Sequence, residues 1–233
     1  MTESKLPQNN QSGRMAKRDR FIDLQMKIQK NNPVIIDGGA HHGHIIQKFL
    51  SSYNKPIIYA FEPIPDSIDI LKNRFSNHNN IKIFEKALGA SNSSITFNVL
   101  NNVVSSSILQ PNERICKYHG SKMNIIKSIQ VEQIRLDSIA ELKNKEIDIV
   151  KLDLQGYELE ALKGMQGIIE NIKTITIEVE FIALYQNQAL FSDIDIFLRQ
   201  NNFQLFNLYE LWTQQDGQLT AGDAIYLNNL CFE

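Results

Sequence analysis

The stretch from Val34 to Gly43 joins a short apolar run to an acid and a glycine-containing turn. The β-branched run 34–36 is typical of a buried strand, and glycines let the backbone turn tightly beside a ligand. Helical spacing follows from His44 to Leu50. The turn is therefore predicted to lie at a helix N-terminus with exposed amide donors, which is the outline of a nucleotide-binding loop.

The glycine spacing separates this loop from the nicotinamide fingerprint. That fingerprint needs Gly-x-Gly-x-x-Gly and an acid about 20 residues further on, whereas this loop has Gly39 and Gly43 with His41 between them. Glu62 ends the next apolar run, 57–61, and an acid at the tip of a second strand suits a ribose with two free hydroxyls. An ordinary strand-to-helix turn and a nicotinamide-dependent reductase remain the alternatives.

Strands and helices alternate along most of the chain. Such alternation predicts an α/β fold of parallel strands joined by right-handed helical crossovers. We expect strands at 34–36, 57–61, 81–88, 147–154 and 174–181. The first helix is expected to begin near Phe21 and to end before Pro33. Further helices are expected at 44–52, 65–76, 159–170 and 192–200. Two closing runs, 203–208 and 224–227, flank a turn at 215–217 and predict an antiparallel edge to a mixed sheet.

The middle of the chain departs from this alternation. Two expected strands, 94–100 and 128–136, enclose a polar loop that contains Ser105, Ser106 and Ser107. A loop of this length inside a domain is usually functional. We expect it to form a lid or part of a substrate wall, with simple disorder as the alternative.

Composition limits the classes of partner. A chain of 233 residues fits one domain, predicted over 21–233 after a flexible polar segment, 1–20. The 42% hydrophobic and 21% charged residues and the net charge of -2 favour a small-molecule partner over nucleic acid or an anionic membrane. Neither a membrane span nor a signal peptide is predicted. Cys116 and Cys231 indicate no disulfide and no zinc site, so we expect reduced thiols and a cytoplasmic location.

Three blocks of residues occur in order between about Val34 and Asn228. They are Asp-Gly-Gly-Ala-His-His-Gly at 37–43, Tyr-Ala-Phe-Glu-Pro at 59–63, and Ile-Val-Lys-Leu-Asp-Leu-Gln-Gly-Tyr-Glu at 149–158; Leu-Lys-Gly at 162–164 and Ile-Glu-Val at 177–179 follow the third. Together they resemble the FkbM family of class I S-adenosylmethionine-dependent methyltransferases. Two positions depart from the family pattern: His41 replaces the usual Asn, and Gln155 stands where the family often has Glu.

The resemblance implies a Rossmann-like seven-stranded mixed sheet, with helices on both faces and an antiparallel last strand. It implies methyl transfer from S-adenosylmethionine to a hydroxyl of a small metabolite, such as a sugar, polyketide, peptide or lipid-like acceptor, with S-adenosylhomocysteine as the product. It assigns the ribose to Glu62 and the border of the adenine to 85–88. The full set of implied cofactor-binding residues is Asp37, Gly38, Gly39, Ala40, His41, Gly43, Glu62, Pro63, Lys86, Ala87 and Asp153.

Acids at the carboxyl ends of the strands are the candidates for catalysis. A hydroxyl is a poor nucleophile until its proton leaves, and a placed base typically contributes about 10²–10⁴-fold. Asp153 lies near the end of the fourth core strand, Glu158 opens the following helix and Glu178 lies on the next strand. We predict that these three acids line the acceptor site. Two alternatives stay open: Glu158 serves only the helix dipole, and Lys151 pairs with a purely structural Asp153.

Other residues give weaker indications. Neighbouring histidines at 41, 42 and 44 rarely converge on one ion, and Mg²⁺ at the acids around Asp153 is disfavoured, so no metal ligand is predicted. Tyr157 and Tyr185 are candidates for a substrate wall. Core packing is expected for most of the aromatic residues Phe191, Phe197, Phe203, Phe206 and Trp212. A non-catalytic scaffold protein with the same fold remains the alternative function.

Overall fold

The main sheet contains seven strands with one antiparallel member. The computed structural model describes residues 18–119 and 123–232, so most of the predicted flexible segment 1–20 lies outside the described residues. The strands lie in the order β3-β2-β1-β7-β8-β10-β9, and β10 runs antiparallel to both of its neighbours. This is the mixed sheet that the sequence predicts. The strand bounds are β1 Val34–Gly38, β2 Ile57–Phe61, β3 Ile81–Phe84, β7 Ile147–Leu152, β8 Ile172–Glu180, β9 Phe203–Thr213 and β10 Leu219–Asn228.

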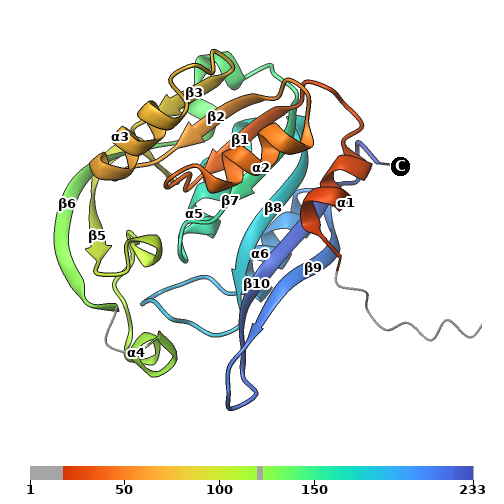
Figure 1. Cartoon of the computed structure of the whole chain (residues 1–233). Coiled ribbons are helices and arrows are strands. Elements are labelled where there is room, and N and C mark those ends of the chain that lie inside the picture. The colour runs from red at the N-terminus through yellow and green to blue at the C-terminus, as the bar shows by residue number, and fades with distance from the viewer. Residues whose placement is uncertain (1–17, 120–122, 233) are drawn as a thin grey trace, which may run out of the picture.

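Helices cover both faces of this sheet, because successive side chains of a strand point to opposite sides. Ile35 packs in one cluster with residues of α1 (Arg20–Lys27), α2 (His44–Ser52) and α3 (Pro65–Arg74). Ile36 packs in the other cluster with residues of α5 (Glu158–Lys163) and α6 (Phe191–Gln200). Figure 1 shows α1 and α2 in front of the sheet, with α5 and α6 behind it.

A second, three-stranded sheet lies beside the first (Figure 1). Its order is β4-β6-β5, with β4 at Ala87–Leu88, β5 at Ser93–Leu100 and β6 at Ile125–Ile134. The prediction of one strand over 81–88 is therefore wrong. The chain leaves the main sheet after Phe84, and Ala87 and Leu88 pair instead with β6. This switch brings residues 86–88 to the carboxyl end of the main sheet.

The polar loop between β5 and β6 is tied to the rest of the protein. It contains the short turn η1 (Val103–Ser105) and α4 (Glu113–His119), a helix that the sequence analysis missed. The Ser107 hydroxyl donates to the carbonyl of Gln155 at 2.8 Å, and the Tyr185 hydroxyl donates to the carbonyl of Ser105 at 2.6 Å. Both bonds reach the segments that follow β7 and β8, so the loop forms a wall over the carboxyl ends of those strands.

Several element ends differ from prediction. α1 ends at Lys27, well before Pro33, where the Ile28 N–H donates to Leu24. The predicted helix 159–170 is divided at Gly164 into α5 and a 3-10 helix, η5 (Gln166–Asn171). A side chain at Gly164 would have its Cβ 1.9 Å from the Gly89 carbonyl oxygen, so this position requires close backbone packing. Two further 3-10 turns, η3 (Leu136–Ser138) and η4 (Ala140–Leu142), precede β7.

Three expectations from the sequence can be compared with the fold: those on membrane spans, on the cysteines and on Trp212. Within 18–119 and 123–232, no helix has both the length and the apolar character to cross a membrane. Cys231 is an exposed free thiol, whereas the side chain of Cys116 lies outside the described residues. Trp212 is 63% exposed, so the expectation that it packs in the core is wrong.

Candidate active site

The loop after β1 uses its amide groups within the protein. The N–H groups of Gly39 and Ala40 both donate to the Phe61 carbonyl at the end of β2, at 3.1 and 3.0 Å. The N–H of Gly43 donates to Ala40 at 2.8 Å. The prediction of exposed donors is therefore wrong for these three positions. A loop whose amides are engaged in this way lacks the anion cradle that a phosphate-bearing nucleotide requires.

Two buried ionisable side chains, those of Asp37 and Lys151, support the backbone of the loop after β1. Asp37 on β1 lies directly opposite Lys151 on β7, and its Oδ1 is 3.2 Å from the Lys151 Nζ. The same ammonium donates to the carbonyls of Gly38 and Gly39 at 3.1 and 3.0 Å. Asp37 is fully buried. It therefore fixes the loop through Lys151, and the structure does not bring it to the cavity above.

Glu62 joins the loop to the end of β2. Its Oε2 accepts from the His41 N–H at 2.8 Å, and its Oε1 accepts from the Ile64 N–H at 2.9 Å. The side chain is 3% exposed, and this burial raises the pKa of Glu62 to about 7 despite the two backbone donors. Each carboxylate oxygen retains a further acceptor position, which leaves Glu62 able to receive hydroxyl donors from a ligand.

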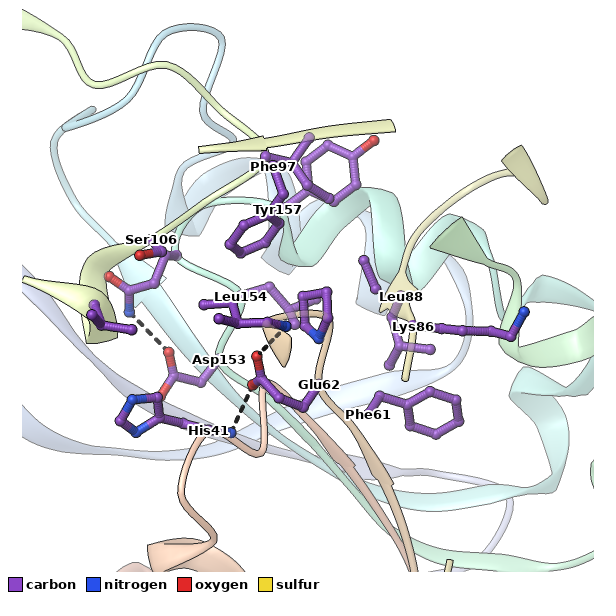
Figure 2. Close-up of a pocket in the computed structure, with 17 residues that line it drawn as sticks. His41, Phe61, Glu62, Lys86, Leu88, Phe97, Ser106, Asp153, Leu154 and Tyr157 are labelled. Atoms are coloured by element: carbon purple, nitrogen blue, oxygen red, sulfur yellow. Dashed lines mark hydrogen bonds between the residues drawn. The ribbon is translucent and has the colours of Figure 1, made fainter. Parts of the chain in front are cut away.

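A cavity lies over this loop (Figure 2). Of the predicted cofactor residues, seven line it: Gly39, His41, Glu62, Pro63, Lys86, Ala87 and Asp153. Four do not line it: Asp37, Gly38, Ala40 and Gly43. These four residues help to fix the backbone conformation of the loop instead. At Gly43, for example, φ is +77° and a Cβ would lie 2.3 Å from the ring of Phe75.

The sequence analysis proposed Tyr157 as a wall residue but missed most of the upper wall of this cavity. Figure 2 shows Phe97 and Tyr157 across the space from Glu62 and His41. Phe97 comes from β5, and Val103, Ser106 and Ile108 come from the polar loop. The expectation that this loop forms a wall indicated the region without indicating these side chains. The remaining lining residues are Phe61, Ile64, Leu88, Leu154 and Gln155.

A second cavity adjoins the first. Asp153 and Gln155 line both cavities. The Nε2 amide of Gln155 donates to Asp153 Oδ1 at 2.9 Å and to Glu178 Oε2 at 2.8 Å. The structure therefore brings Asp153 and Glu178 together, and the connection between them runs through Gln155.

Asp153 carries a negative charge at the place where the two cavities meet. Burial acts to raise the pKa of Asp153, but the Lys151 ammonium and the hydrogen bond from Gln155 outweigh it and hold the pKa below its ordinary value. Its Oδ2 is 3.8 Å from the Lys151 Nζ, and its side chain is 41% exposed. Asp153 is therefore ionised at neutral pH and accessible to a ligand.

His41 presents an uncharged imidazole to the first cavity. Burial, followed by the neighbouring His42 and His44, lowers the pKa of His41 to about 4. Its Nε2 is buried and has no hydrogen-bond partner in the described part of the chain. No group of three or more His, Cys, Asp and Glu within residues 18–119 and 123–232 is arranged to hold a metal ion.

Glu158 fixes the turn that follows β7. Its Oε1 accepts from the Leu154 N–H at 2.6 Å, and the side chain is 1% exposed. Glu158 is among the lining residues of neither cavity, so the structure does not bring it to the predicted acceptor site. Burial, with Asp153 nearby, raises the pKa of Glu158 to about 7.

This raised pKa predicts a pH-dependent gain in stability from Glu158→Gln. An acid whose pKa is higher in the folded state stabilises the fold below its unfolded value near 4.5, and that contribution is lost as pH rises through about 7. The variant should gain about 1 kcal/mol relative to wild type between pH 6 and pH 8, or roughly 2–4 °C in Tm. Thermal denaturation of the ligand-free protein measures this difference. The exposed Glu170→Gln is the matched control, and an equal difference at both pH values contradicts the assignment.

The first cavity fits a nucleoside cofactor without phosphates. Glu62 offers acceptors for ribose hydroxyls, Phe61 and Leu88 supply apolar surface, and Asp153 lies toward the second cavity. At Gly39, φ is +74° and a Cβ would lie 2.0 Å from the Asp153 carbonyl oxygen. Only glycine lets the loop approach the β7 turn this closely. The unpartnered His41 Nε2 adds a polar atom for a ligand.

The sheet order and this loop define the class I methyltransferase fold. Residues 37–205 match the model of the methyltransferase FkbM domain. The chain therefore belongs to the FkbM family of S-adenosylmethionine-dependent methyltransferases, and it is an enzyme of that class.

Three relatives illustrate the similarity. The chain is 27% identical over 169 residues to 2-O-methyltransferase NoeI of Sinorhizobium fredii, a match that covers 69% of each protein. It resembles the methyltransferase FkbM structure from Methylobacillus flagellatus KT, with a TM-score of 0.54 and 17% identity, over 84% of this chain and 44% of that one. It also resembles magnesium protoporphyrin IX methyltransferase of Synechocystis PCC 6803 with bound S-adenosylmethionine, with a TM-score of 0.51 and 9% identity, over 90% and 76%.

Proposed function

We propose that the protein transfers a methyl group from S-adenosylmethionine to a hydroxyl oxygen of a small molecule held in the second cavity. The position of Asp153 carries this proposal, because its carboxylate belongs to the walls of both cavities. Oxygen as the methylated atom is supported by the similarity to a 2-O-methyltransferase. A hydroxyl acceptor in one cavity and a cofactor in the other would meet at this residue.

The chain's own residues supply binding, orientation and a proton acceptor. Glu62 would hold the ribose hydroxyls, and the apolar residues of the first cavity, with Lys86 and Ala87, would border the adenine. When bound, S-adenosylmethionine supplies a methyl carbon activated by its sulfonium sulfur. Alignment of the acceptor oxygen with that carbon can contribute about 7–11 kcal/mol in the best cases.

Asp153 is the proposed base. Its carboxylate would accept the hydroxyl proton of the acceptor, which becomes more acidic as the oxygen takes up the methyl group. A carboxylate with a low pKa suffices for this step, because the proton leaves as the oxygen gains positive charge. Gln155 would orient Asp153 through its 2.9 Å hydrogen bond, and the same amide would hold Glu178 on the rim.

Calorimetry and a turnover assay test the proposal in sequence. The full chain should bind S-adenosylhomocysteine, and it should release that product from S-adenosylmethionine when a hydroxyl acceptor from a metabolite mixture is present. NAD is the control ligand and should not bind, since the loop amides are already engaged. Absence of S-adenosylhomocysteine binding by folded protein would reject the cofactor assignment. Binding without any turnover across the mixture would favour a scaffold.

A further inference from the structure

The second cavity holds far more acid than base. Its wall contains five carboxylic acids, Asp153, Glu178, Glu180, Glu210 and Asp223. Among the lining residues that the structure describes, Arg20 is the one cation. The acids come from the turn after β7 and from β8, β9 and β10, so they are distant in sequence and meet only through the order of the strands.

The charges that could neutralise this cavity are already engaged. Arg20 forms an ion pair with Asp223, and Lys151 lies closer to Asp37 than to Asp153, at 3.2 against 3.8 Å. Glu178 and Asp223 lie directly opposite each other on antiparallel strands, where like charges are destabilising. Among the lining residues that the structure describes, no cation other than Arg20 is therefore available to the acids of β8.

Glu180 has a buried carboxylate oxygen, Oε2, without a hydrogen-bond partner in the described part of the chain. Its side chain is 3% exposed. Burial, followed by the nearby Glu158 and Asp153, raises the pKa of Glu180 well above its ordinary value. A buried carboxylate without a partner is costly, and a charge-assisted hydrogen bond from a bound cation would remove that cost.

An aromatic residue of the same cavity suits a cation as well. Trp212 lies on β9, lines the cavity and is 63% exposed. The face of an indole ring attracts an ammonium group within about 6 Å. A metal ion is the other cationic candidate, but the described residues contain no grouping of three ligands for one. The wall favours an organic cation.

We infer that the acceptor of this enzyme carries a protonated amine, held by Glu180 and Glu178, in addition to the hydroxyl that faces Asp153. This inference rests on the proposed function, because it takes the second cavity as the acceptor site. The ammonium group has no free electron pair, so it serves to bind and orient the molecule. The methyl group goes to the hydroxyl oxygen, whose proton Asp153 accepts.

Matched pairs of small molecules test the inference. The full chain, saturated with S-adenosylhomocysteine, is titrated with glucosamine against glucose, galactosamine against galactose, and 2-amino-1,3-propanediol against glycerol. Each pair differs by one ammonium in place of one hydroxyl. At least one amine should bind tenfold or more tightly than its neutral partner. If no amine is preferred in any pair, the inference is overturned.

A variant of Glu180 shows whether this side chain, and not the overall negative charge of the protein, causes the preference for amines. Glu180→Gln keeps the size of the side chain and should reduce the amine preference at least tenfold, whereas the exposed Glu170→Gln should retain it. Circular dichroism and S-adenosylhomocysteine titration check that Glu180→Gln folds. An unchanged amine preference in that variant would overturn the assignment. Failure of the wild-type protein to bind S-adenosylhomocysteine would instead count against the proposed function, so the two failures are distinguishable.

Discussion

If Glu62 holds the ribose as proposed, replacing it with alanine should lower the affinity for S-adenosylhomocysteine at least 100-fold. The carboxylate accepts from the backbone N–H groups of His41 and Ile64 and is also the proposed partner of the ribose hydroxyls. Hydrogen bonds to a charged group contribute about 1.5–3 kcal/mol each, and a buried donor left without an acceptor costs about 1–3 kcal/mol. Calorimetric titration measures the loss, and thermal denaturation should show a lower Tm.

The amide variant sharpens this prediction. Glu62→Gln keeps one acceptor oxygen but directs an NH₂ group toward one of the two backbone donors, so its affinity should lie between those of wild type and Glu62→Ala. Glu141→Ala is the matched control: Glu141 lines neither cavity, and its side chain is 38% exposed and pairs with Lys82. Wild-type affinity in Glu62→Ala would remove the ribose assignment.

Asp153→Asn should lower kcat about 10²–10⁴-fold, the range typical of a lost general base. The asparagine oxygen can still accept the hydrogen bond from Gln155, so the turn keeps its shape, but the side chain no longer takes a proton. The release of S-adenosylhomocysteine at saturating cofactor and acceptor measures kcat. A rise in KM with unchanged kcat would show that Asp153 only binds the acceptor. The exposed Asp66→Asn is the control for a changed net charge.

The sequence predicted the main sheet well because its strands are buried on both faces. Such strands appear as continuous apolar runs, and Ile57–Phe61 matches its predicted bounds. Alternation with helices then determines the parallel order and places Glu62 and Asp153 at one edge. The switch at 85–86 was missed because apolar residues stand on both sides of the charged pair Glu85-Lys86, and the whole run was assigned to one strand. Only the pairing of Ala87 with β6 shows that the first strand has ended.

The detail of the site depends on contacts between distant segments. No local pattern indicates that the Phe61 carbonyl takes up the amides of Gly39 and Ala40, so the loop was expected to offer donors that are already engaged. The role of Asp37 likewise depends on Lys151, which is 114 positions further along the chain. The acids at Glu180 and Asp223 belong to one cavity only because β10 pairs with β8.

The turn after β7 has a thermodynamic consequence. Asp153 and Gln155 belong to both walls, and Gln155 and Gly156 adopt positive φ angles of 54° and 95°. A ligand that shifts either side chain in one cavity also alters the other cavity. Linkage requires such coupling to be reciprocal, so the factor by which the cofactor changes acceptor affinity equals the factor by which the acceptor changes cofactor affinity. Cofactor and acceptor affinities would then be coupled through the side chains of Asp153 and Gln155.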